Sequence, residues 1–127
     1  MDNYTDIRDF YSLDSMVEHA VDNIRFDKSD CFSVDIIANE TIAENIIRIL
    51  ILNYNCKFGV FNFNNVDYSG DYIISLTSDM ELYCQPDYQK NGNRYNTDAD
   101  IIYVYEDVKA DVLNSIEAHE IIIFGIK

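Results

Sequence analysis

Three carboxylates, Asp14, Glu18 and Asp22, follow one another at every fourth position of the chain. In an α-helix this spacing places side chains on one face, with charges about 6 Å apart along the axis. Carboxylates form charge-assisted hydrogen bonds with arginine and lysine, so the row predicts contact with a basic surface. The alternative is a solvated helix face whose charges serve solubility.

A second acidic group lies near a predicted strand and is mixed with tyrosines. Its members are Asp98, Asp100, Tyr103, Glu106 and Asp107, accompanied by Asp111, Tyr95 and Tyr105. Carboxylates pair bidentately with guanidinium and aromatic rings stack on it, so this group predicts binding to an arginine-rich surface. The alternative is that Tyr103 and Tyr105 share one strand face and cover the core.

Residues that could support catalysis are few. The chain has two histidines, His19 and His119, and no local Cys-His signature. Asp98 and Asp100 could hold a divalent cation, but no third ligand follows at a recognisable spacing. Phosphate-binding glycine motifs are missing as well. We therefore expect no enzyme, no metal and no cofactor.

The charge balance indicates the kind of partner. Twenty-three acidic residues face nine basic ones, a formal net charge of -14 over 127 residues. Such a charge repels nucleic acid and anionic membranes and steers the protein toward basic surfaces. In a predicted exposed loop, Lys90 and Arg94 are the only close basic pair, so direct nucleic-acid binding is disfavoured.

Composition predicts one folded cytoplasmic domain covering residues 1–127. With 48% hydrophobic residues the chain is too apolar for an acidic disordered region. The longest apolar stretch, from Ile46 to Leu52, is interrupted by Arg48, and no secretory leader is recognisable. Three cysteines at wide spacings indicate free thiols in a reducing compartment, with Cys84 in a core pattern.

Two stretches have helical periodicity. Apolar residues predict an amphipathic helix over 13–25 with Ser12 as its N-cap. A second helix is expected from Glu40, capped by Asn39, although a strand after Ile47 is an alternative. A third, short helix is expected from Val108 to Ile116.

Alternating apolar residues predict strands elsewhere. The expected ranges are 31–38, 58–64, 71–77, 80–84, 100–105 and 120–126, with a β-bulge near Gly59. An irregular or helical turn is expected around 5–11. These elements predict an α+β fold, with a mostly antiparallel twisted sheet of five to six strands and two to three helices packed on one face.

In size, acidity and want of enzymatic motifs, the whole chain resembles the small phage-encoded anti-CRISPR and anti-restriction proteins, several of which act as nucleic-acid mimics. No motif matches, so no residue roles are carried over. The resemblance implies an inhibitor that binds the basic groove of a host defence nuclease or effector. The leading hypothesis is therefore an acidic interaction protein that binds no nucleic acid and no membrane.

Two other functions remain open at this point. An antitoxin or immunity protein that neutralises a basic toxin would have the same electrostatics. A small hydrolase or ligand-binding domain would use the long polar loop from Gln85 to Thr97 and would need a pocket lined by convergent polar groups. Edge strands rich in Ile and Tyr also leave a homodimer open.

Overall fold

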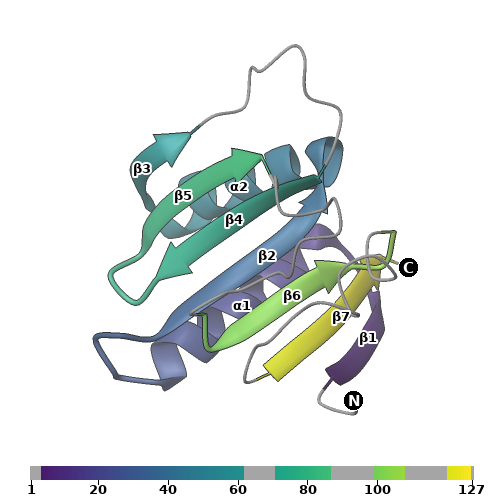
Figure 1. Ribbon diagram of the computed structural model, residues 1–127, viewed down its shortest axis with the longest axis horizontal. Helices are drawn as coiled ribbons and strands as arrows, with labels where there is room; N and C mark the ends of the chain where they lie inside the picture. Colours follow the sequence, from purple (N-terminus) through teal and green to yellow (C-terminus); the bar gives the residue numbers. More distant parts are fainter. Residues whose placement is uncertain (1–3, 62–70, 87–98, 108–119, 127) are drawn as a thin grey trace.

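The computed structural model describes residues 4–61, 71–86, 99–107 and 120–126. These ranges form an α+β domain with two helices and one mixed sheet (Figure 1). Along the chain the described elements are β1 (Tyr4–Phe10), α1 (Leu13–Phe26), β2 (Ser33–Asn39), α2 (Glu40–Tyr54), β3 (Lys57–Phe61), β4 (Asp71–Thr77), β5 (Glu81–Pro86), β6 (Ile101–Tyr105) and β7 (Glu120–Ile126).

Helix α1 begins where the sequence predicts. The Ser12 hydroxyl accepts a hydrogen bond from the Ser15 backbone N–H at 3.3 Å, and the Ser15 hydroxyl accepts one from the Ser12 N–H at 3.2 Å. This reciprocal pair satisfies two backbone donors that the first turn leaves open. The buried stripe of the helix consists of Met16, Val17, Ala20, Val21 and Ile24.

Helix α2 also has the predicted start, because the Asn39 side chain accepts a hydrogen bond from the Ile42 N–H at 3.0 Å. It continues without a break to Tyr54, so the alternative strand after Ile47 does not form. Asn55 ends the helix in the left-handed conformation with φ 52°, and the next N–H, from Cys56, donates to the Leu50 carbonyl at 3.3 Å. Asparagine tolerates this conformation better than most residues.

Strand directions differ from the expectation. In the described part of the chain seven strands take the order β1-β7-β6-β2-β4-β5-β3. β4 pairs antiparallel with both β2 and β5, whereas the other four pairings are parallel. The sheet is therefore mixed and mostly parallel. The reason is that α1 and α2 each connect two strands of the same direction, as crossover units do.

One strand was not predicted, since an irregular or helical turn was expected where β1 forms. β1 lies at the edge of the sheet, parallel to β7, with Ile7 opposite Phe124. At the other edge, the pairing of β3 with β5 shifts in register between Phe58 and Phe61, which agrees with the bulge expected near Gly59. The expected helix from Val108 to Ile116 lies outside the described residues.

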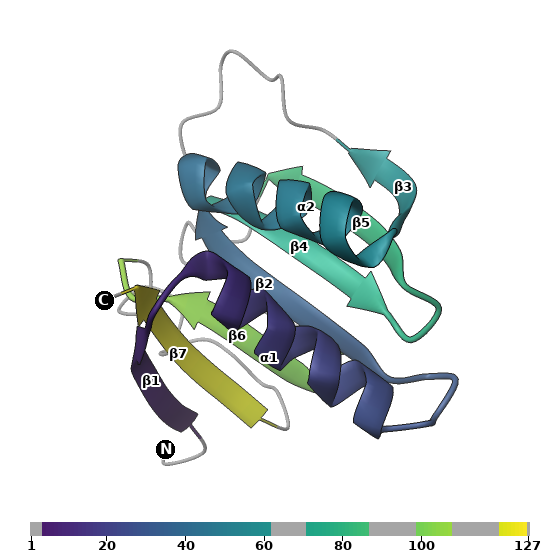
Figure 2. The ribbon, with the colours of Figure 1, turned by 180° about the vertical axis from the view of Figure 1, so that it is seen from behind.

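Both helices cover the same face of the sheet and lie side by side (Figure 2). The main core fills the space between the two layers, and its largest fully buried side chains include Tyr72, Tyr103, Phe124 and Met16. A second apolar cluster lies on the opposite sheet face and contains Ile37, Ile73, Ile102, Val104 and Ile121. The outer surfaces of α1 and α2 are therefore the described helical surfaces that a partner can reach.

Candidate functional site

The predicted carboxylate row is on the surface of α1. Asp14, Glu18 and Asp22 are all exposed, opposite the stripe that the helix buries. Within the described residues none of the three has an ion-pair partner, and Asp14 accepts one hydrogen bond, from the Asn53 side-chain amide of α2 at 3.4 Å. We call these three residues the α1 acidic face. It is an uncompensated row of negative charge on a rigid element.

Tyr54, the last residue of α2, lies beside the α1 acidic face. The guanidinium carbon of Arg25, in the last turn of α1, is 5.4 Å from the centre of the Tyr54 ring, within the range of a cation–π contact. The pKa of the Tyr54 hydroxyl is raised, first by burial and then by the charges of Glu18 and Asp22, while Arg25 lowers it. The α1 carboxylates and this ring therefore share one electrostatic environment.

The described members of the second predicted acidic group do not form a cluster. Asp98 lies outside the described residues. Asp100 precedes β6 and is tied to the start of β2, because its carboxylate accepts from the Ser33 N–H and its own N–H donates to the Ser33 carbonyl, both at 3.0 Å. This half-buried carboxylate joins the starts of two neighbouring strands, and its expected role in partner binding stays a prediction.

Glu106 and Asp107 follow the other end of β6. The five residues of β6 separate Glu106 from Asp100, so the two lie about 20 Å apart along the extended chain. Glu106 is half-buried, and its carboxylate packs on the backbone of β7, where a Cβ placed on Gly125 would lie 2.5 Å from Oε2. Among the described members of the second group, only Asp107 is exposed.

Tyr103 is not at the surface either, so its expected contact with a partner is corrected. Its side chain is completely buried, facing α1 from β6. The hydroxyl lies 2.8 Å from His19 Nδ1 and accepts a hydrogen bond from Asn23 Nδ2 at 2.7 Å. Phe10 packs edge-on against the His19 ring. The alternative interpretation, a tyrosine that covers the core, is confirmed.

The two buried cysteines are poorly suited to nucleophilic chemistry. Cys56 and Cys84 are buried, and burial raises the pKa of both thiols, that of Cys84 to about 12. Near neutral pH both therefore carry the proton, and a thiol is a much weaker nucleophile than a thiolate. Cys31 is exposed. The predicted core position of Cys84 is confirmed.

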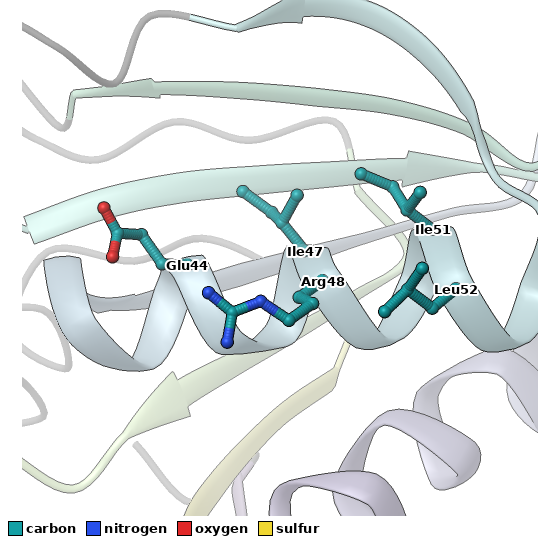
Figure 3. Close-up of a pocket in the computed structure, with 5 residues that line it drawn as sticks. All are labelled: Glu44, Ile47, Arg48, Ile51 and Leu52. Carbon is teal, nitrogen blue, oxygen red and sulfur yellow. The ribbon is translucent and has the colours of Figure 1, made fainter.

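A shallow hollow of about 500 Å³ lies along the outer side of α2. Its described lining consists of Glu44, Ile47, Arg48, Ile51 and Leu52, with Ile47 and Ile51 pointing to the same side of the helix (Figure 3). This lining is largely apolar, and none of these five side chains is a nucleophile or a histidine. Most of the loop from Gln85 to Thr97, on which the ligand-binding alternative depends, lies outside the described residues.

Sequence reasoning missed the contact between Arg25 and Tyr54. This contact depends on how α1 packs beside α2, since the two residues are 29 positions apart in the sequence. One signal was available: Arg25 lies three residues after Asp22, at the end of the carboxylate row. The sequence position of Arg25 shows that the carboxylate row ends there, but it does not show that the guanidinium lies over the ring of Tyr54.

No family model matches the chain, and no curated protein or solved structure matches it either. Among the described helices, none is long and apolar enough to cross a membrane. The described histidine, cysteine and acidic side chains form no group of three that could hold a metal ion.

Proposed function

We propose that this chain is an acidic interaction protein that inhibits a basic, nucleic-acid-binding partner, with the α1 acidic face inserted into the partner's binding groove. A host defence nuclease or effector complex is the class of target that fits the whole-chain resemblance. The partner's groove would offer lysine and arginine side chains that otherwise contact phosphates. Inhibition then results from competition with nucleic acid for the same groove.

The observation that carries this proposal is the state of the three α1 carboxylates. They are exposed, no ion-pair partner for them exists in the described part of the chain, and they stand on a helix fixed by a capping box and by a buried apolar stripe. Side chains held on such an element lose little backbone freedom when a partner binds. They are therefore better suited to binding than the same charges on a flexible tail.

The dimensions of the face favour a few discrete contacts over imitation of a duplex. Asp14 and Asp22 are separated by about 12 Å along the helix axis, whereas each strand of DNA carries about one charge per 3.4 Å. Two further exposed acids, Asp27 and Asp30, follow α1 in the connection to β2 and lengthen the acidic surface. Binding through these charges should weaken as salt rises.

The proposal is tested by neutralising the face. The triple variant D14N/E18Q/D22N removes three charges while keeping similar side-chain shapes. Exposed ion pairs contribute about 0.2–1 kcal/mol each, so the loss of three should weaken binding by about 3- to 150-fold. The measurement is a pull-down by tagged protein from cells that carry nucleases and CRISPR effectors, followed by titration of the captured protein with wild type and variant.

The matched control is E44Q/D107N/E120Q, which removes three exposed charges from other parts of the surface. Wild type and control should both retain a basic protein that salt or competing DNA or RNA releases, and the triple variant should lose it. Equal weakening by the two triple variants would mean that net charge acts without a defined face. Unchanged binding by D14N/E18Q/D22N would contradict the proposal.

A further inference from the structure

The ring of Tyr54 has the surroundings of an arginine-binding site. It is half-buried at the end of α2, and the guanidinium of Arg25 already stacks over it at 5.4 Å. Guanidinium groups bind aromatic faces because the planar cation is weakly hydrated and is attracted by the ring quadrupole. The structure thus contains an example of the ligand chemistry that this ring accepts.

Carboxylates complete the surroundings of the ring. Glu18, Asp22 and Asp14 all act electrostatically on the Tyr54 hydroxyl, and the hydrogen bond between Asp14 and Asn53 joins the first turn of α1 to the end of α2. A guanidinium on the ring therefore lies in a field of three negative charges. Arginine can satisfy ring and carboxylate together, since it presents a flat face and five N–H donors in its plane.

Arg25 makes only one of the two kinds of contact that a guanidinium could make at this site. It is exposed, and within the described residues it stacks on the ring without a carboxylate close enough for an ion pair. An exposed cation–π contact stabilises by only about 0.5–1 kcal/mol, a factor of about two to five. A second guanidinium that takes the ring and also pairs with an α1 carboxylate would make more contacts than Arg25 makes.

We propose that the Tyr54 ring is the site where an arginine side chain of the basic partner binds, and that Arg25 covers this site in the free protein and is displaced on binding. The inference rests on the proposed function, because it places the partner against the α1 acidic face. It adds the residue type that the partner must contribute. An arginine-bearing segment should be preferred over a lysine-bearing one of equal charge.

The test uses fluorescent hexa-arginine and hexa-lysine peptides as probes, with binding to the full chain followed by anisotropy at low salt. Wild type should bind the arginine peptide more tightly. Replacing Arg25 by glutamine uncovers the ring and should increase that preference about two- to fivefold, the size of an exposed cation–π contact. The matched control, R48Q, removes the same charge from the exposed side of α2 and should strengthen both peptides equally.

Two substitutions of Tyr54 separate the ring from the hydroxyl. Y54F keeps the aromatic face and should preserve the arginine preference, whereas Y54L should abolish it and leave lysine-peptide binding unchanged. Since Tyr54 packs against the core, Y54L counts only if its circular dichroism and unfolding transition match those of wild type. If Y54L fails that check, the comparison of R25Q with R48Q decides.

Equal affinity for the two peptides, together with the same response to R25Q and R48Q, would overturn the arginine site. That result would leave the proposed function intact if D14N/E18Q/D22N still loses the captured partner. The opposite result is also distinguishable. If the arginine preference is present but D14N/E18Q/D22N binds the partner as tightly as wild type, only the proposed function is contradicted.

Discussion

The position of one proton determines the hydrogen bonds around Tyr103. The Asn23 amide nitrogen is a donor only, and it contacts both the Tyr103 hydroxyl, at 2.7 Å, and the backbone carbonyl of His19, at 3.1 Å. The hydroxyl therefore accepts from Asn23, and its own proton points to the remaining partner, His19 Nδ1, at 2.8 Å. His19 Nδ1 must then be an acceptor.

The first prediction at this scale is that neutral His19 carries its proton on Nε2. Nitrogen chemical shifts of the His19 ring near neutral pH should show the Nε2–H tautomer, and Y103F should release the ring to a mixture of tautomers. A chain with H119Q leaves one histidine signal and makes the assignment direct. Observation of the Nδ1–H tautomer in wild type would show that Tyr103 donates elsewhere.

At the scale of the element, the α1 acidic face has a cost in stability. Glu18 lies four residues from both Asp14 and Asp22, and like charges at this spacing destabilise a helix by about 0.2–0.5 kcal/mol per pair. E18Q should therefore raise the free energy of unfolding by about 0.4–1 kcal/mol. The measurement is urea unfolding at low salt, repeated at high salt, where screening should remove most of the gain.

The matched substitution D14N keeps the helix and removes only one of the two repulsive pairs. Asp14 is also in the first turn, where a negative charge interacts favourably with the helix dipole, so D14N should give little or no gain. A stabilisation by D14N as large as that by E18Q would mean that general self-repulsion of the acidic chain, and not the spacing on α1, determines the effect.

Local periodicity predicted the elements but not how the strands pair. Both helix caps and the position of the carboxylate row follow from short-range patterns, and each is present in the structure. β1 was missed because Asp6, Arg8 and Asp9 interrupt apolar alternation, while its pairing with β7 is made by backbone groups far apart in the chain.

The parallel direction of β6 and β7 could have been predicted from the sequence. β6 and β7 contain continuous apolar runs, Ile101–Val104 and Ile121–Phe124, and both runs are buried on the two faces of the sheet. Strands buried on both faces are typical of parallel sheets, whereas a half-exposed antiparallel strand alternates. The same distinction holds for the candidate site. The exposed face of α1 was predictable from the helical spacing of its apolar residues, whereas the burial of Tyr103 depends on how α1 packs on the sheet.

At the scale of the whole molecule, the core includes groups that ionise at alkaline pH. Cys84, on β5, and Tyr103, on β6, both face the helical layer and are almost completely buried. Burial raises the pKa of Cys84 from 9.0 to about 12 and raises the pKa of the Tyr103 hydroxyl above its ordinary value of 10.0. In the unfolded chain both groups lose their protons at lower pH than in the folded protein.

The domain should therefore be destabilised by base. For a group whose pKa is raised by folding, the stabilisation is complete below the unfolded value and is lost as pH rises toward the folded value. The free energy of unfolding should fall above pH 9.0 through Cys84 and more steeply above pH 10.0 through Tyr103. Each group contributes a slope of about 1.4 kcal/mol per pH unit.

Urea unfolding between pH 7 and pH 11 measures this dependence. C84A lowers stability at neutral pH by leaving a small cavity, but it should flatten the decline that begins near pH 9.0, whereas Y103F should leave that first decline and reduce the second. The part of the decline that a variant removes is thus assigned to the residue it replaces, because Cys56 and Tyr54 also have raised pKa values and stay in both variants. If both variants kept the wild-type slopes, Cys84 and Tyr103 would not control the alkaline loss, which would then come from other groups such as Cys56 or from surface repulsion in this highly acidic chain.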